Sequence, residues 1–151
     1  MISIRPATVG ERGELEALQW RASLVWEEYR EALLAHPDAI ELPEEQIVEG
    51  RTIVAEVEGR IVGFAVVLPR ADGEAELDGL FVEPSAWRSG IGTRLIADAV
   101  ILAAAAGAEF LHVVANPLAE GFYSSRGFEL TGEQSTRFGV AHAMRKAIGK
   151  P

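Results

Sequence analysis

Ser89-Gly90-Ile91-Gly92-Thr93 stands at the junction between an apolar run and a helical pattern. The run covers residues 77–82, and apolar side chains then recur at helical spacing over residues 91–103. The glycines therefore lie at the start of a helix that follows a strand. Glycine lacks a Cβ, so a ligand can approach its backbone closely, and the first turn of a helix offers unpaired N–H groups with partial positive charge. The stretch predicts an anion site, which we assign to a pyrophosphate.

The spacing disagrees with two common phosphate-binding motifs. A P-loop requires a lysine directly after its last glycine, whereas Gly92 is followed by Thr93 and Arg94. The dinucleotide fingerprint requires a third glycine where this chain has Leu95. A Gly-x-Gly pair by itself is equally compatible with a tight turn that only starts a helix.

Length and composition indicate one globular domain without metal or disulfides. The chain has 151 residues, of which 48% are hydrophobic, and this is near the usual size of a single domain. The absence of cysteine excludes disulfides, a thiol nucleophile and cysteine-based metal sites. His36, His112 and His142 are scattered without ligand spacing, so we expect no metal site.

No segment of the sequence has the pattern of a membrane or export segment. Residues 1–6 show no apolar signal-peptide core. The longest apolar stretch, residues 95–108, contains Asp98 and is too short to span a bilayer. We therefore expect a soluble cytoplasmic protein without a membrane partner.

The negative charge of the chain is concentrated in one segment. The net charge is −9, and residues 11–49 carry eleven acidic residues and three arginines, a net charge of −8. No basic stripe is present, which disfavours nucleic acid as a partner. The acidic segment either attracts a cationic partner or is simply a solvated helix face.

Periodicity and turn residues predict the order of the elements. Residues 15–33 read as one long amphipathic helix or as two helices joined near Ser23, and residues 90–106 as a helix closed by Gly107. A short helix is expected over residues 119–125. Strands are expected at residues 2–5, 52–57, 61–68, 74–82, 110–115, 128–130 and 141–146. The prediction is a single α/β domain over residues 1–151, with a mixed central sheet of about six to seven strands flanked by helices.

Two blocks of sequence carry a resemblance to a known family. Residues 77–84 read Leu-Asp-Gly-Leu-Phe-Val-Glu-Pro and residues 87–93 read Trp-Arg-Ser-Gly-Ile-Gly-Thr. Residues 116–128 read Asn-Pro-Leu-Ala-Glu-Gly-Phe-Tyr-Ser-Ser-Arg-Gly-Phe. In this order they resemble the strand, the Arg/Gln-x-x-Gly-x-Gly/Ala motif and the Asn-x-x-Ala-x-x-Phe-Tyr-x-x-x-Gly-Phe motif of the GCN5-related N-acetyltransferase (GNAT) family. One position departs, because Trp87 stands where the family has Arg or Gln.

The resemblance implies acetyl-CoA or another acyl-CoA as co-substrate and a sheet that is splayed at the acyl-CoA site. The strand of Leu80 and Val82 would separate there from the strand at residues 113–115. Many members of the family are dimers, so the resemblance also allows a homodimer. The residues that would bind the cofactor are Leu80, Phe81, Val82, Arg88, Ser89, Gly90, Ile91, Gly92, Thr93, Asn116 and Tyr123.

The resemblance also assigns catalytic roles. Tyr123 lies at the family's tyrosine position and would be the general acid for the CoA sulfur, because a phenol is protonated at neutral pH. The alternative is a tyrosine that only packs in the core. Asn116 either hydrogen-bonds the cofactor or ends its strand in an Asn-Pro turn.

The candidates for the general base are carboxylates in and just after the strand that precedes the glycine turn. Glu76 and Asp78 alternate onto the same face as Leu80 and Val82. Glu76 is longer and reaches further toward an ammonium, directly or through one water, whereas Glu83 is a weaker candidate at the strand end. Each of these carboxylates is alternatively a solvated side chain.

Two aromatic residues of the N-terminal helices, Trp26 and Tyr29, either form a substrate wall or pack in the core.

The leading hypothesis is a transferase that moves an acetyl or other acyl group from acyl-CoA to the primary amine of a small cationic molecule. Because the chain has no cysteine, the transfer would be direct. Acetylation of protein N-termini or lysines is an alternative enzyme activity. A non-catalytic acyl-CoA-binding or sensor module is the alternative outside enzymes.

Overall fold

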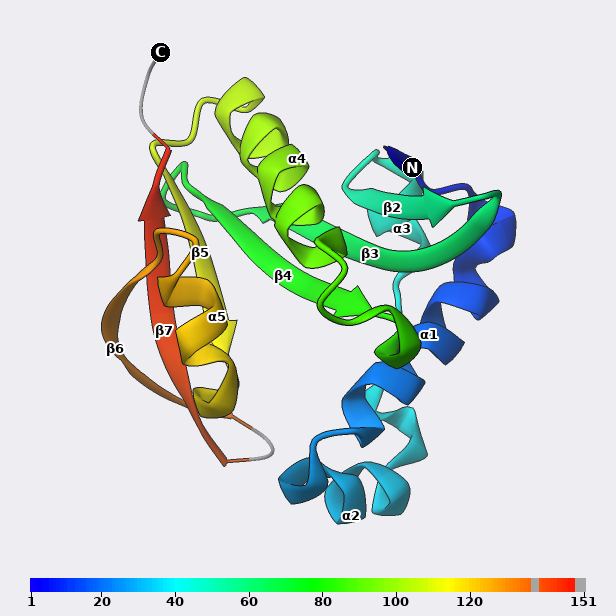
Figure 1. Cartoon of the computed structure of the whole chain (residues 1–151). Helices are drawn as coiled ribbons and strands as arrows, with labels where there is room; N and C mark the ends of the chain where they lie inside the picture. The colour runs from blue at the N-terminus through cyan, green and yellow to red at the C-terminus, as the bar shows by residue number, and fades with distance from the viewer. Residues whose placement is uncertain (137–138, 149–151) are drawn as a thin grey trace. The chain divides into compact units, whose positions relative to one another are not determined.

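The structure is a computed structural model that describes residues 1–136 and 139–148, without the side chains of residues 27–29 and 37. Within this part of the chain, seven strands form one sheet in the order β1-β2-β3-β4-β5-β7-β6 (Figure 1). The strands are β1 (Ile2–Pro6), β2 (Thr52–Val57), β3 (Arg60–Pro69), β4 (Ala75–Val82), β5 (Phe110–Ala115), β6 (Glu129–Thr136) and β7 (Gly139–Ala147). The helices are α1 (Arg12–Leu24), α2 (Glu27–Ala35), α3 (Glu44–Val48), α4 (Ile91–Ala105) and α5 (Glu120–Ser124). Short 3-10 turns lie at Val9–Glu11, Pro37–Ala39, Pro84–Ala86 and Pro117–Ala119.

The sheet is mixed because of one crossover. β4 and β5 are parallel and are joined through α4, as parallel strands require. Four registers are antiparallel: β1 with β2, β2 with β3, β5 with β7 and β6 with β7. This confirms the predicted α/β fold with a mixed sheet of six to seven strands flanked by helices.

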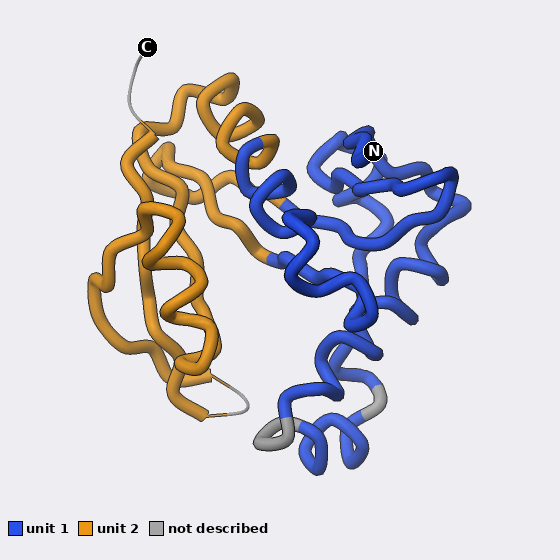
Figure 2. The backbone as a smooth tube through the Cα atoms, viewed as in Figure 1, with its two compact units in different colours: residues 1–66, 79–97 blue, residues 67–78, 98–151 orange. Residues whose placement is uncertain are grey.

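Contacts divide the chain into two compact units (Figure 2). Unit 1 contains residues 1–66 and 79–97, and unit 2 contains residues 67–78 and 98–151. The predicted single domain over residues 1–151 therefore stays a prediction.

Unit 1 holds the antiparallel strands β1 to β3 and the N-terminal helices. α1 buries Leu15, Leu18 and Ala22, which recur at helical spacing. α1 and α2 are separate helices, because Trp26 has an extended backbone (φ −79°, ψ 102°) that cannot continue a helix. Of the two alternatives for residues 15–33, the structure therefore has two helices, with the break just beyond Ser23.

Gly63 in unit 1 sets a close approach between β3 and its neighbours. A Cβ at Gly63 would lie 3.0 Å from the Phe81 carbonyl oxygen and 3.2 Å from the side chains of Ile91 and Leu95. Glycine at this position lets the backbone of β3 lie against the first turns of α4. The start of α4, which carries the glycine turn, is thereby fixed against the middle of the sheet.

Unit 2 holds β5 between β4 and β7, with β6 at the edge. β5 buries Leu111, Val113 and Ala115 on one face, the alternation expected of a strand. β6 is longer than the predicted residues 128–130. All eight of its residues are exposed, so it lacks the apolar alternation by which a strand is recognised in a sequence.

Candidate active site

The glycine turn before α4 has an unusual backbone. Gly90 has φ +85°, and Arg88 has φ +67°, a left-handed conformation that is rare for a residue with a side chain. Ser89 Oγ donates a hydrogen bond to the Ala86 carbonyl, and Arg94 N–H donates the first helical hydrogen bond to the Gly90 carbonyl at 3.1 Å. Left-handed residues in such a turn aim successive N–H groups into one concavity that suits an anion.

The surroundings of this turn also fit a negative ligand. The first turn of α4 contains no acidic residue. Residues 88–90 are exposed, and a Cβ at Gly90 would meet nothing within 4 Å. The residues of the predicted phosphate-binding stretch, Arg88, Ser89, Gly90, Ile91, Gly92 and Thr93, therefore form one exposed turn and the first turn of a helix.

Trp87 is anchored rather than free at the start of this turn. Its Nε1–H donates to the Val82 carbonyl at 2.8 Å, and its ring lies 5.9 Å from the Trp26 ring, centroid to centroid. Trp87 is still 39% exposed. Trp26 thus contacts Trp87, a partner that the sequence did not suggest, and the side chain of Tyr29 lies outside the described residues.

The predicted cofactor-binding residues of this strand lie at the C-terminal end of β4. Leu80, Phe81 and Val82 are each half-buried, and the Phe81 ring packs against Phe64 at 5.3 Å between centroids. A Cβ at Gly79 would lie 2.7 Å from Cε2 of Phe81, so glycine at this position leaves room for the ring. The β4–β5 ladder pairs residues 75–77 with residues 111–113.

Tyr123 is an interior residue of unit 2. It is only 8% exposed, and its ring makes edge-on contacts with Phe122 and Phe128 at 5.2 and 5.3 Å. Burial raises the pKa of its hydroxyl to about 12. The phenol is therefore protonated at neutral pH, as a proton donor must be, and it also packs in an aromatic cluster.

Asn116 serves the turn that follows β5. Its Oδ1 accepts a hydrogen bond from Leu118 N–H at 2.9 Å and caps the 3-10 turn at Pro117–Ala119. The strand-ending role is therefore present in the structure. Contact with a cofactor stays a prediction.

The carboxylates of β4 have raised pKa values. Burial raises the pKa of Glu76, the nearby Asp78 raises it further, and Arg70, whose Nη1 lies 3.8 Å from Glu76 Oε1, opposes both effects. Burial also raises the pKa of Asp78. A carboxylate whose pKa is raised is a stronger base in its charged form, which suits both residues for proton transfer.

Comparison with known families gives the assignment. The model of the acetyltransferase (GNAT) family matches residues 17–128, well over half of the chain and both motif blocks. The chain belongs to this family.

Individual relatives agree with the GNAT assignment. An uncharacterised N-acetyltransferase of Mycobacterium bovis is 30% identical over 93 residues, which are 60% of this chain and 60% of that protein. The match thus spans about three fifths of the relative's length.

Solved structures share the fold. A GCN5-related N-acetyltransferase of Rhodopseudomonas palustris is 26% identical, with a TM-score of 0.77 over 96% of this chain and 94% of that chain. The PaiA N-acetyltransferase of Thermoplasma acidophilum, solved in complex with coenzyme A, is 21% identical, with a TM-score of 0.73 over 97% and 99% of the two chains. These similarities confirm the GNAT fold.

Glu83 of this GNAT chain is committed to an ion pair. Arg21 donates to both carboxylate oxygens of Glu83, at 2.9 and 2.7 Å. This bidentate pair lowers the pKa of Glu83, so Glu83 is a poorer base than Glu76. The pair also lines a hollow of about 300 Å³ in unit 1, whose other charged residues are Arg5, Glu11, Glu14, Glu56 and Arg60.

His112 is the residue of this region that sequence reasoning missed. It is the register partner of Glu76 on the adjacent strand β5. Its Nε2 is buried and is the one such side-chain nitrogen or oxygen atom without a hydrogen-bond partner among the described residues. The sequence does not indicate the register between β4 and β5. The pairing of His112 with Glu76 could therefore not be predicted from it.

Residues 1–136 and 139–148 were compared with the requirements of a metal site and of a membrane span. No cluster of three or more His, Cys, Asp or Glu side chains in them could hold a metal ion. None of their helices is both long enough and apolar enough to cross a bilayer.

Proposed function

We propose that this chain is an acyl-CoA-dependent N-acyltransferase that moves an acetyl group to a primary amine. The observation that carries the proposal is the left-handed turn of Arg88 and Gly90 at the start of α4. Such a turn offers aligned backbone N–H groups to a pyrophosphate. The GNAT assignment and the coenzyme A bound to the Thermoplasma relative support acetyl-CoA as the ligand.

The roles of the residues follow from their chemistry. Acyl-CoA supplies a thioester, and residues 88–93 hold its phosphates through backbone N–H groups. Tyr123, protonated at neutral pH, donates a proton to the departing sulfur. Glu76 accepts the proton that the acceptor ammonium must lose before its nitrogen can attack.

The charge of the N-terminal segment supports a small cationic acceptor. Residues 11–49 carry a net charge of −8. Two arginines outside this segment neutralise part of its negative charge. Arg5 forms an ion pair with Glu11 through Nη2, and Nε of Arg51 lies 2.9 Å from Oε1 of Glu49. The remaining acidic excess lies in unit 1, together with the glycine turn, and attracts a cation at long range.

A non-catalytic acyl-CoA sensor is the second candidate. It is favoured by the deep burial of Tyr123 and by the ion pair between Arg70 and Glu76. In this alternative the chain would bind acyl-CoA without transferring the acyl group.

A two-stage experiment tests the proposal. Thermal unfolding is first followed with increasing acetyl-CoA, since a ligand that binds only the folded state raises Tm by mass action. Thiol release from acetyl-CoA is then measured with 1,4-diaminobutane, lysine, an aminoglycoside and peptides with a free N-terminal alanine or an internal lysine. The chain has no cysteine, so a thiol reagent reports released CoA without background from the protein.

The outcomes separate the candidates. Stabilisation together with thiol release supports the transferase, and the best amine indicates the class of acceptor. Stabilisation without release from any amine supports the sensor. No stabilisation even at millimolar acetyl-CoA would refute both.

A further inference from the structure

Four strands of unit 2 place one row of charged and titratable residues side by side. Glu76 on β4 pairs in register with His112 on β5, and His112 pairs with Arg145 on β7. Arg145 in turn pairs with Glu129 on β6. Register partners on neighbouring strands share one face of a sheet. The row therefore reads acid, imidazole, guanidinium and acid across a single face.

His112 is the unusual member of this row. Its Nε2 is buried without a hydrogen-bond partner, although buried polar atoms in folded proteins nearly always have one. If this nitrogen served packing alone, a carbon atom in its place would make the folded state more stable. Its presence therefore points to a hydrogen bond or a proton that the nitrogen receives during function.

The surroundings keep the His112 imidazole neutral. Burial lowers the pKa of His112, and the positive charges of Arg70 and Arg145 lower it further, against the opposing effect of Asp72 and Glu74. The Phe110 ring, which lies 6.2 Å from the imidazole between centroids, adds an apolar neighbour. A neutral imidazole has one ring nitrogen with a lone pair, and it is ready to accept a proton.

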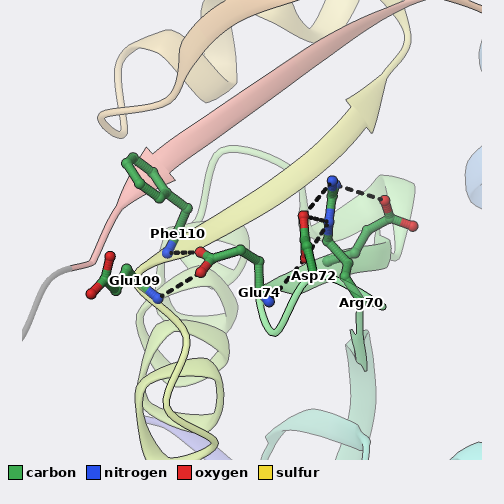
Figure 3. A network of polar contacts seen from close by, with 6 residues as sticks. Arg70, Asp72, Glu74, Glu109 and Phe110 are labelled. Carbon is green, nitrogen blue, oxygen red and sulfur yellow. Dashed lines mark hydrogen bonds and ion pairs between the residues drawn. The ribbon is translucent and has the colours of Figure 1, made fainter.

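A polar network lies next to this register pair, at residues that precede Glu76 on β4 and His112 on β5 (Figure 3). The Glu74 carboxylate accepts hydrogen bonds from Phe110 N–H at 2.5 Å and Glu109 N–H at 3.4 Å, so the turn before β4 is tied to the start of β5. Asp72 accepts from Glu74 N–H at 3.0 Å and pairs with Arg70. The register of β4 and β5 is thereby fixed directly beside Glu76.

We propose that His112 is a proton relay for acyl transfer, receiving through Glu76 the proton that the acceptor ammonium loses. This inference rests on the acyl-transferase function proposed above. An N–H bond of the ammonium breaks, and the proton passes to a carboxylate oxygen of Glu76. Rotation of the Glu76 carboxylate away from Arg70, whose Nη1 lies 3.8 Å from it, brings the new O–H within reach of His112 Nε2. The O–H bond breaks as an N–H bond forms at Nε2, and the imidazolium then releases its Nδ1 proton to water. Glu76 returns to the charged form, and the amine keeps the lone pair with which it attacks.

The proposal predicts different effects on Tm for the same substitution at two histidines of unit 2. His142 is the matched control, because its Nδ1 lies 2.5 Å from Glu120 Oε1. His142→Phe removes a partnered nitrogen and lowers Tm. His112→Phe replaces an unpartnered nitrogen and leaves Tm unchanged or raised. His112→Gln, which keeps a polar side chain that does not titrate, is the second variant at this position.

The kinetic test uses acetyl-CoA with the best amine from the panel above. For His112→Phe and His112→Gln we expect kcat to fall about tenfold or more near neutral pH. KM for acetyl-CoA and the stabilisation by acetyl-CoA stay at the wild-type values. The loss in kcat narrows as the pH rises toward the pKa of the amine, because solvent then supplies the free amine. A purely structural role would not produce this recovery at high pH.

The outcomes distinguish the relay from the underlying function. If the wild type transfers acetyl groups and both His112 variants keep its kcat and pH profile, the relay is wrong and the transferase stands. A fall in Tm for His112→Phe as large as that for His142→Phe would also overturn it, since the imidazole would then be structural. If acetyl-CoA does not stabilise the wild type, the transferase fails and the relay fails with it.

Discussion

Gly90→Ala tests the assignment of the glycine turn most directly. Gly90 has φ +85°, and an alanine Cβ would meet no atom within 4 Å. The substitution therefore adds no clash, and its cost is the left-handed backbone of a residue with a side chain, about 1–2 kcal/mol. For a chain of this length, 1 kcal/mol corresponds to about 2–4 °C in Tm. We expect Tm to fall by about 2–8 °C.

Gly107→Ala is the matched control at the other end of α4. Gly107 has φ +90° and also has open space around its Cβ position. The same backbone penalty applies, so Gly107→Ala should lose a similar Tm. Only Gly90 lies in the turn assigned to the pyrophosphate, where an added methyl group stands between the ligand and the backbone N–H groups.

The response to acetyl-CoA separates the two variants. At a concentration of 100 times Kd, a ligand stabilises the folded state by about 2.7 kcal/mol. If Gly90→Ala weakens binding tenfold, the same concentration gives about 1.4 kcal/mol, which halves the shift in Tm. Gly107→Ala should keep the full shift. An equal ligand-induced shift in both variants would show that the glycine turn does not hold the phosphates.

Three further substitutions probe other parts of the structure. Tyr123→Phe should lower kcat for thiol release by about 10²-fold or more while keeping the stabilisation by acetyl-CoA; an unchanged kcat would remove Tyr123 as the acid. Gly79→Ala forces the Phe81 ring to move, because the new Cβ would lie 2.7 Å from it, and should cost about 1–3 kcal/mol in urea unfolding; wild-type stability would contradict this. Glu11→Gln should make Tm depend less on pH between about 4.5 and 2 than it does in the wild type. The reason is that Arg5 holds the pKa of Glu11 at about 2, below its usual 4.5. That stabilisation is present above about pH 4.5 and is lost as the pH falls toward 2, so thermal unfolding in acid should differ from the wild type.

The parts of the fold that the sequence predicted are those with a strong local pattern. The helix over residues 90–106 and its Gly107 closure were predicted because apolar spacing and a left-handed glycine are local signals. β5 was predicted at its observed bounds for the same reason. β6 was predicted too short, because its exposed residues on both faces give no alternation.

The candidate site could be predicted only where its residues are consecutive in the sequence. The glycine turn is one continuous stretch, so its helix-start geometry could be inferred from residues 89–93. Contacts between distant segments could not be inferred in this way. The Arg21–Glu83 and Arg70–Glu76 pairs and the register of Glu76 with His112 depend on how strands and helices meet. The pair with Arg21 lowers the pKa of Glu83 whereas burial raises that of Glu76, which agrees with the predicted preference for Glu76 as the base.

Under the proposed function, the departure from the family motif at Trp87 is compatible with phosphate binding. The family has a polar or charged side chain here, but backbone N–H groups of residues 88–93 suffice to bind an anion if the turn has the right shape. Trp87 helps to fix that shape, since it donates to the Val82 carbonyl and packs against Trp26. The adjacent Arg88 keeps a cationic side chain next to the turn, and its left-handed backbone is sterically costly. A costly conformation persists only where its surroundings hold it in place, and in this turn Trp87 is one of the residues that do so.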